Sequence, residues 1–408
     1  KRQINIIREA TYSFSQSSVQ SARTTDENYL YEGSFEPIGG DPFWRGHLKK
    51  YQINADGTVG VLRWDAGEQM KVMADSSRTI KTYKAGALTD FTSANLTPAD
   101  VGITTGTDTE KNALRDVIVG YIRGNSTYNP EQDASANVWK LGDVFRSTPI
   151  TVGTPSAFFD DLRDCKNQFA AHRTGHVRSS AVGNRLIVVG ANDGQFHAVK
   201  THCTYDSATG NYTSLSGDGD EAWSFVPPNL LPKLKNIAHS THPSSLTHQY
   251  FVDGPVTVAD VWDGTDTTGC SAACIGHGTC KADNSWRTLL VFGLGRGAVN
   301  TGWSSSQYCD SGMNNIYSTT YPYYCGYHAM NLNDSLNPTY LWHLNFTSDT
   351  ARAAQAPYIG DPWSKMMIGR VRVKESGEEK EKWVGFIGAG HNASDCKGGG
   401  ACDTRGKG

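Results

Sequence analysis

The chain has 408 residues, of which 38% are hydrophobic and 10% aromatic, and 43 are glycines. This length and composition suffice for a large core and favour β-structure with many turns, either as two domains or as one large all-β domain. The 38 basic and 41 acidic residues give a formal net charge of −3 without long single-sign runs, which excludes an electrostatic case for nucleic acid or an anionic membrane as partner.

The chain begins Lys1-Arg2-Gln3, with neither an initiator Met nor a signal peptide. No stretch reaches the roughly 20 consecutive apolar residues that a membrane-spanning helix needs. We therefore expect an internal fragment of a longer protein, without a membrane span of its own.

Residues 1–135 are predicted to form a β-rich flanking region with one short helix. Residues 48–53 and 58–62 alternate like paired strands around the turn at 54–57, which predicts a hairpin. Residues 112–123 carry apolar side chains at helical spacing, and residues 125–137 are polar and turn-rich, as in a linker. The predicted boundary lies there, with a second region over residues 136–408.

A strand pattern recurs three times in this second region. Each unit starts with a short strand-like run, at residues 147–152, 254–258 and 366–371. Longer apolar runs follow, at residues 185–199 and 221–225, at 286–297, 327–330 and 340–344, and at 382–392. Four strands per repeated unit predict the blades of a β-propeller, and the third unit stops before its later strands. The predicted fold class is all-β, an incomplete β-propeller.

Long insertions interrupt the predicted blades. The units start about 110 residues apart, whereas a compact blade needs roughly 40–50. Seven of the nine cysteines fall in insertions or in the last Gly-rich loop: Cys270, Cys274, Cys280, Cys309, Cys325, Cys396 and Cys402. This placement predicts disulfide bonds on exposed loops and an oxidising compartment. The spacing of Cys270, Cys274, His277 and Cys280 also leaves a zinc site open as the less favoured alternative.

Three other motifs are interpreted as structural. Residues 293–298 match a loose dinucleotide-binding G-x-G-x-x-A pattern, but no helical sequence follows and the other units place glycine-rich turns at the same point. Residues 218–221 gather acidic side chains as a calcium loop does, yet lack the alternating ligands of an EF-hand, which favours a solvated turn. His197 and His328 occupy matching strand positions, which indicates packing. No H-E-x-x-H, G-x-S-x-G or phosphate-binding G-x-x-x-x-G-K motif occurs.

A tyrosine-dense loop at residues 316–327 is the candidate contact surface. Tyrosine combines apolar area with a hydrogen-bonding tip, which suits recognition. The candidate residues are Tyr317, Tyr321, Tyr323 and Tyr324. A loop that folds down over its own blade explains the same composition equally well.

An ordered set of motifs resembles the PilC/PilY family of type IV pilus tip-associated proteins. The set comprises residues 44–51, 139–150, 189–198, 223–232, 250–255 and 286–295. The resemblance implies a modified β-propeller at the periplasm or cell surface, located at the pilus tip. It implies a non-enzymatic role in pilus assembly, in opposing retraction and in adhesion, with minor pilins and a host or abiotic surface as partners.

The resemblance also bears on cofactors. Some family members bind calcium through a D-x-D-x-D type loop, which is absent here, so calcium is implied only for the parent protein and no cofactor is expected for this chain. The alternative function is a periplasmic quinone-dependent dehydrogenase, which also uses tryptophan-bearing blades. Such an enzyme would show a vicinal cysteine pair, and no two cysteines are adjacent here. A repeat module of another surface machine is the third hypothesis.

Overall fold

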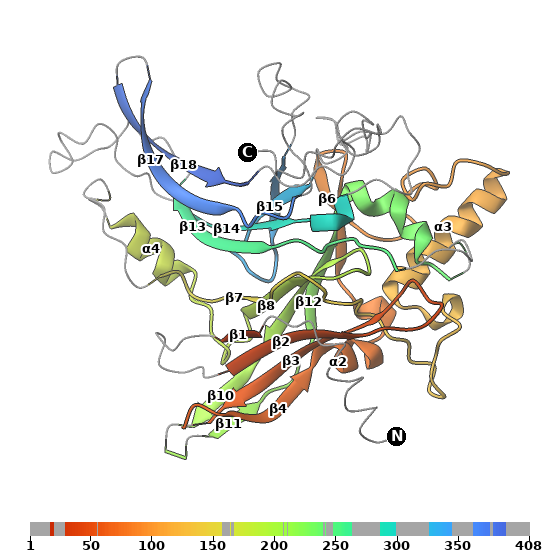
Figure 1. Ribbon diagram of the computed structural model, residues 1–408, viewed down its shortest axis with the longest axis horizontal. Coiled ribbons are helices and arrows are strands. Elements are labelled where there is room, and N and C mark those ends of the chain that lie inside the picture. The colour runs from red at the N-terminus through yellow and green to blue at the C-terminus, as the bar shows by residue number, and fades with distance from the viewer. Residues whose placement is uncertain are drawn as a thin grey trace, which may run out of the picture.

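The protein is mostly β, with a few helices and several separate open sheets (Figure 1). The computed structural model describes residues 17–19, 29–54, 56–156, 164, 167–206, 208–209, 211–239, 241, 248–262, 286–298, 326–344, 362–375 and 378–388. Cys203 is the cysteine within these ranges, and it is buried and free. The seven cysteines predicted to form disulfides and the four candidate tyrosines lie outside the described residues.

An antiparallel sheet in the order β1-β2-β3-β4 opens the chain. Its strands are β1 (Ser17–Val19), β2 (Tyr29–Glu36), β3 (Arg45–Ile53) and β4 (Val59–Asp65). The predicted hairpin is confirmed, because Ile53 lies opposite Val59 in the β3–β4 register. Asp65 then caps helix α2 (Ala66–Val72) by accepting a hydrogen bond from the backbone N–H of Gly67.

Helix α3 (Asp108–Arg123) confirms the predicted helix and starts four residues earlier than its apolar pattern. The extension comes from a capping box, in which Thr107 and Glu110 satisfy each other's backbone N–H groups. Gly124, in the left-handed region with φ 82°, ends the helix. Short 3-10 helices η1 (Asp75–Ser77) and η2 (Ser126–Tyr128) lie before and after this part of the chain.

The second sheet has six strands, in the order β6-β5-β12-β9-β8-β7. Four of them are the strands predicted for the first unit, β7 (Ile150–Val152), β8 (Arg185–Gly190), β9 (Phe196–Thr201) and β12 (Glu221–Val226). The other two, β5 (Ile80–Lys84) and β6 (Ala87–Asp90), come from the first region, and β5 pairs parallel with β12. The two regions predicted from the sequence thus share a sheet, and the boundary between them stays a prediction.

A helix, a hairpin and a 3-10 helix lie in the connections between or after the strands of this sheet. Helix α4 (Gln168–Gly175) precedes β8, and the hairpin of β10 (Cys203–Asp206) and β11 (Asn211–Ser214) fills the insertion after β9. A 3-10 helix, η3 (Pro228–Asn236), follows β12 and is almost entirely buried. The sequence predicted a single helix, and it missed α2 and α4 because neither exceeds eight residues.

The third sheet is antiparallel, in the order β13-β14-β15-β16, and matches the predicted second unit. Its strands are β13 (Val256–Trp262), β14 (Trp286–Gly293), β15 (Tyr327–Asn331) and β16 (Thr339–His343). The third unit contributes the hairpin of β17 (Met367–Glu375) and β18 (Glu378–Phe386). The strands predicted at these positions are confirmed.

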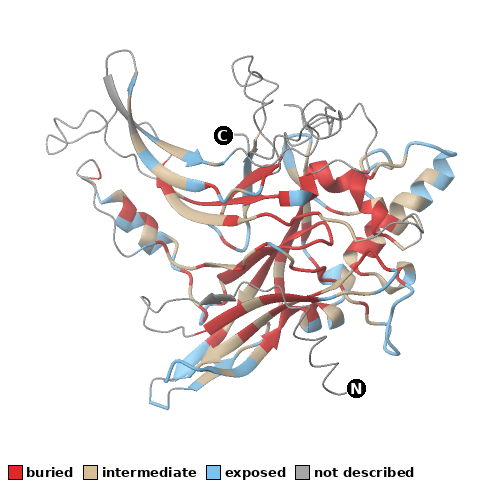
Figure 2. Cartoon of the chain, in the orientation of Figure 1, coloured by how far each residue is buried: buried red, intermediate tan, exposed pale blue. Residues whose placement is uncertain are grey.

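The sheets stack face to face because consecutive side chains of a strand point to opposite faces. On β8, Ile187 packs against the β1–β4 sheet, whereas Leu186 and Val188 pack toward the β13–β16 sheet. On β14, Leu290 faces the six-stranded sheet, and Val291 faces the β17 side. Figure 2 shows the buried residues concentrated along these central strands, with exposed residues at the hairpin tips.

Candidate functional site

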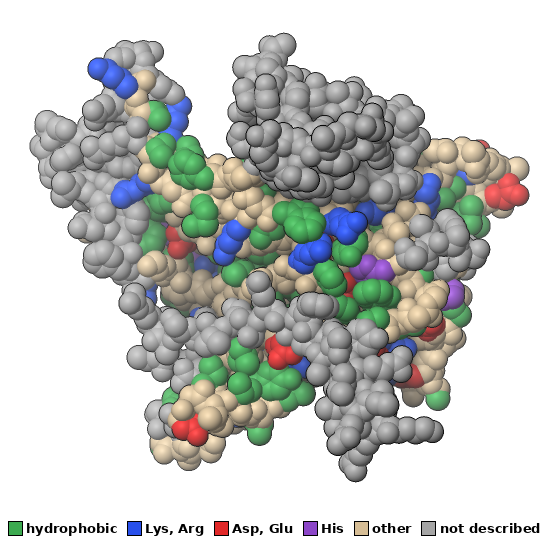
Figure 3. Space-filling view, viewed as in Figure 1, with side chains coloured by type: hydrophobic (Ala, Val, Ile, Leu, Met, Phe, Trp, Pro, Cys, Tyr) green, Lys and Arg blue, Asp and Glu red, His purple; other side chains and the backbone are tan. Residues whose placement is uncertain are grey.

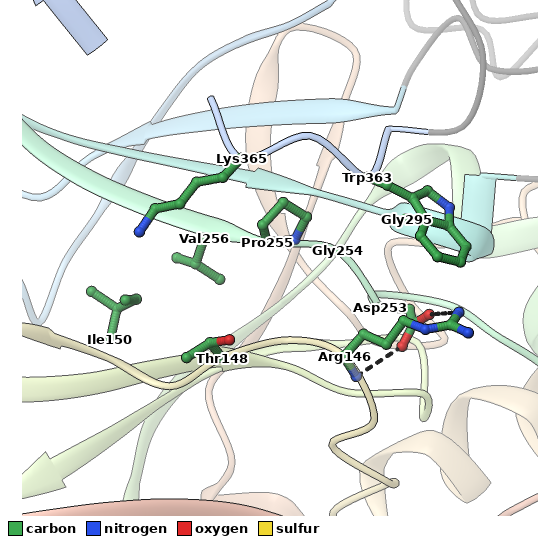
Figure 4. A pocket seen from close by; sticks show the side chains of 10 residues that line it. All are labelled: Arg146, Thr148, Ile150, Asp253, Gly254, Pro255, Val256, Gly295, Trp363 and Lys365. Carbon is green, nitrogen blue, oxygen red and sulfur yellow. Dashed lines mark hydrogen bonds and ion pairs between the residues drawn. The ribbon is translucent and has the colours of Figure 1, made fainter. Parts of the chain in front are cut away.

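A pocket of about 310 Å³ lies where the three predicted units begin (Figure 4). Its walls come from the residues just before and within β7, from the start of β13, and from the segment that leads into β17. The lining residues are Arg146, Thr148, Ile150, Asp253, Gly254, Pro255, Val256, Gly295, Trp363 and Lys365.

Local sequence brings these three segments together. A proline directly precedes the first strand of the first two units, at Pro149 and Pro255, and its fixed φ and missing N–H suit an edge position. In the third unit Pro362 lies five residues before β17. Gly254 approaches the backbone of Gly293 so closely that a Cβ would lie 2.3 Å from the Gly293 carbonyl oxygen. Only glycine fits there without a shift of the chain.

An ion pair organises the pocket. Arg146 Nη1 lies 3.3 Å from Asp253 Oδ2, and the backbone N–H of Arg146 donates to Asp253 Oδ1 at 3.2 Å. The Arg146 guanidinium also stacks on the indole of Trp363, with 4.2 Å between its central carbon and the ring centroid. The Asp253 side chain is fully buried, whereas the Arg146 side chain is 37% exposed. The guanidinium is therefore accessible to solvent, and the buried carboxylate fixes its position.

Burial governs the charge of Asp253. It raises the pKa of this carboxyl to about 7, because a buried charge loses its hydration, although Arg146 acts in the opposite direction and Asp143 in the same one. The ion pair is therefore fully formed only above neutral pH.

The pocket offers several kinds of contact to a binding partner. Arg146 and Lys365 supply positive charge, Trp363 supplies an aromatic surface that is 42% exposed, and Ile150 and Val256 supply apolar walls. This combination suits an acidic or aromatic peptide segment.

The glycine-rich loop at residues 293–298 is confirmed as a structural turn. Gly295–Ala298 forms a single 3-10 turn, η5, which is too short for a phosphate-binding helix. A Cβ on Gly297 would lie 1.6 Å from the carbonyl oxygen of Phe251, so this glycine permits close contact of two backbones.

The acidic turn at residues 218–221 differs from the predicted solvated turn. Asp218 and Glu221 are buried, at 8% and 6% exposure. Asp218 accepts hydrogen bonds from Trp64 Nε1 and from the backbone N–H of His202, both at 2.9 Å. Glu221 belongs to a separate ion network. Their oxygens serve internal partners and do not converge on one calcium position.

The two matched histidines are fully buried and do not share a site. His328 Nδ1 lies 2.9 Å from the hydroxyl of Tyr340. His197 lies between two carboxylates, with Nε2 2.9 Å from Asp193 Oδ2 and Nδ1 2.8 Å from Glu221 Oε1. Packing is confirmed for both, but the ionic surroundings of His197 carried no signal in the sequence.

Arg78 completes the buried network around His197. Its guanidinium donates to both oxygens of Glu221, at 2.7 and 2.9 Å, and to Gln195 Oε1 at 3.1 Å. It also donates to the carbonyl oxygens of Ile122 and Arg123 at the end of α3. One side chain from the first region thus ties α3 to β9 and β12.

The stability of the protein should depend on the protonation of His197. Burial alone would lower the pKa of His197, but the charge and hydrogen bond of Asp193, together with Glu221, outweigh it and raise the pKa to about 9 from 6.5. The stabilisation is then complete below about pH 6.5 and is lost as the pH rises through 9. We expect His197→Gln to lose about 2 kcal/mol or more at pH 6, at about 1.4 kcal/mol per pKa unit, and much less at pH 9.

Urea unfolding of both proteins at pH 6, 7.5 and 9 measures this difference. Lys140 and Lys233 have pKa values lowered by burial to about 8 and 7, so they impose an opposite slope on both proteins. Only the difference between the proteins reports on His197. A difference that stays constant or grows between pH 6 and 9 would contradict the ionised imidazole.

On the face drawn in Figure 3, Lys and Arg side chains lie among hydrophobic ones and do not form one continuous charged patch. Among the residues that the structure describes, no helix has both the length and the apolar character required to cross a membrane.

Comparisons with known proteins identify relatives of one kind. The chain is 27% identical over 289 residues to a type IV pilus biogenesis factor PilY1 homolog of Xylella fastidiosa, covering 69% of this chain and 18% of the relative. It is 23% identical over 393 residues to the type IV pilus biogenesis factor PilY1 of Pseudomonas aeruginosa strain PAK, covering 93% of this chain and 27% of the relative. No family model matches the chain, and no solved structure matches it significantly. The chain thus spans about a quarter or less of the length of these relatives.

Proposed function

We propose that this chain, a distant homologue of the PilY1 type IV pilus biogenesis factors, is the strand-rich part of a non-enzymatic protein that promotes pilus assembly and surface adhesion at the pilus tip. The observation that carries the proposal is the similarity to a named pilus biogenesis factor over 93% of the chain. Type IV pili lie outside the cytoplasm, so the proposed location is the periplasm or cell surface.

The stacked sheets support a propeller in the complete protein. The first strands β7, β13 and β17 belong to three different sheets, and β13 contacts both of the others. The six-stranded sheet and the β13–β16 sheet each pack both faces against the sheets that come before and after them in the chain. Radial blades place their first strands together around an axis in this way. Disulfide bonds in the insertions remain a part of the proposal that rests on the sequence, and calcium in the parent protein is a part that rests on the family resemblance alone.

The pocket between the three first strands is the proposed contact site for a minor pilin. An exposed indole stacked on an arginine, beside a lysine and apolar walls, provides the kind of anchor that dominates protein interfaces. The tyrosine-rich loop around Tyr317 and Tyr321 remains a second candidate for contact with a host or abiotic surface.

Trp363→Ala in the full-length protein should reduce the capture of purified minor pilins at least about tenfold, because truncating an interface anchor costs 1.4 kcal/mol or more. Trp363 is 42% exposed, so its removal should leave the fold intact. Trp342→Ala on β16 is the matched control, since Trp342 is 37% exposed and does not line the pocket. Affinity measured by surface plasmon resonance provides the comparison.

Equal binding by the wild type and Trp363→Ala would exclude the pocket as the pilin site but leave the assembly role intact. Failure of the wild type to bind any minor pilin would contradict the assembly role. A purified protein that carries a quinone chromophore and shows dye-linked dehydrogenase activity would replace the proposal with the enzymatic alternative.

A further inference from the structure

A carboxylate–carboxylate–imidazole cluster lies apart from the pocket. Asp41, Glu131 and His239 each offer one ligand atom, and all three atoms lie within 4.8 Å of one another. The residues are 90 and 108 positions apart along the chain, so the fold brings them together and no local acidic run accounts for their proximity.

Three different segments place these side chains. Asp41 lies in the connection between β2 and β3, Glu131 follows η2, and His239 follows η3. The backbone N–H of Phe43 donates to Asp41 Oδ1 at 2.8 Å, and the backbone N–H of Glu131 donates to Asn129 Oδ1 at 2.9 Å. These bonds hold the Asp41 carboxylate and the Glu131 backbone in place.

The distance between the imidazole and Asp41 fits a shared ion, while the Glu131 and Asp41 side chains lie within hydrogen-bonding reach of each other. His239 Nε2 lies 3.7 Å from Asp41 Oδ2, which is too long for a hydrogen bond. Two ligand atoms at about 2.0–2.1 Å from one tetrahedral zinc ion lie roughly 3.3–3.5 Å apart. A small movement of the side chains would bring all three atoms onto such an ion.

The three side chains of the cluster differ in their exposure to solvent. The Asp41 side chain is 6% exposed and points into the cluster, the His239 side chain is 33% exposed, and Glu131 is exposed.

We propose that Asp41, Glu131 and His239 form a zinc site that pins the β2–β3 connection to the segments after η2 and η3. Three protein ligands with a fourth position left for water make an open zinc site. The imidazole selects zinc over calcium and magnesium, since those ions prefer larger sets of oxygen ligands. The site is separate from the cysteine-rich insertion.

Zinc content and affinity test the assignment. Full-length protein is treated with a chelator, dialysed and titrated with zinc chloride by calorimetry, and bound zinc is counted by atomic emission. Glu131→Gln and His239→Gln should each hold one equivalent less than the wild type, or bind it at least about 10–100-fold more weakly, a loss known even for outer-shell partners of metal ligands. Zinc should raise the melting temperature of the wild type but not of the variants.

His202→Gln is the matched control, because His202 is a similarly half-buried imidazole outside the cluster, and it should keep the zinc content of the wild type. Zinc held by cysteines elsewhere would be equal in every variant. Glu131 is exposed, so its variant separates ligand loss from misfolding. Equal zinc in the wild type and Glu131→Gln, or displacement of zinc by equimolar calcium, would overturn the proposal.

Discussion

Arg78→Met is expected to lower the free energy of unfolding by about 3–5 kcal/mol, the usual cost of removing one partner of a buried ion pair. Methionine has a similar length but leaves Glu221 with a buried charge whose remaining hydrogen-bonded partner is His197. Gln195 Oε1 and the carbonyl oxygens at the end of α3 also lose their donor. Arg78→Lys should fall between the two proteins, because an ammonium cannot form the two-pronged contact with Glu221.

Lys81→Met provides the control for Arg78. Lys81 lies on β5, three residues after Arg78, and pairs with Asp90 at the surface, where both side chains are at least 35% exposed. Exposed pairs contribute about 0–1 kcal/mol. Urea unfolding compares the variants, and an Arg78→Met loss no larger than that of Lys81→Met would mean that the network is not intact in solution.

Strands were the part of the fold that local sequence could predict. The apolar runs of β8, β9, β14 and β15 are long, flanked by glycine turns and recur in the same order. Alternation also encodes the stacking, because runs that are apolar at every position need a partner on both faces.

Non-local pairing was beyond local sequence. Ile80 pairs with Ser224 across 144 residues, and the short β5 run carries no mark of its parallel partner. For the same reason, the polar residues of the buried network looked like ordinary surface residues. Asp218 and Glu221 stand in a Gly-Asp turn that is typical of solvent, and partners distant in sequence, Trp64 and Arg78 among them, help to make their burial tolerable.

The pocket could have been found from the repeat itself. Arg146, Asp253 and Trp363 lie three or four residues before the first strand of their units, β7, β13 and β17. Cysteine and tyrosine concentrate in the insertions, so the candidate contact surface was predicted there and not at the strand starts. The Asp41, Glu131 and His239 cluster had no such signal, because its three residues share no motif or spacing.

Phe292→Ala is expected to destabilise the protein by about 3–5 kcal/mol, as for other large aromatic side chains truncated in a core. Phe292 on β14 is fully buried and stacks on Phe196 of β9, with ring centroids 4.3 Å apart. It also meets Phe225 of β12 edge-on. The ring therefore joins the β13–β16 sheet to the six-stranded sheet. Its loss should leave a cavity between these two sheets.

Phe386→Ala on β18 is the control for this interface, because Phe386 is 55% exposed and its loss should change stability by less than about 0.5 kcal/mol. Phe292→Leu should recover much of the loss by refilling the cavity. A single urea transition that moves to lower urea in Phe292→Ala with an unchanged slope would show that the two sheets unfold together. A transition that splits in two would show that the ring couples otherwise separate units. A loss of stability in Phe292→Ala no larger than that in Phe386→Ala would contradict the packed interface on which the proposed propeller depends.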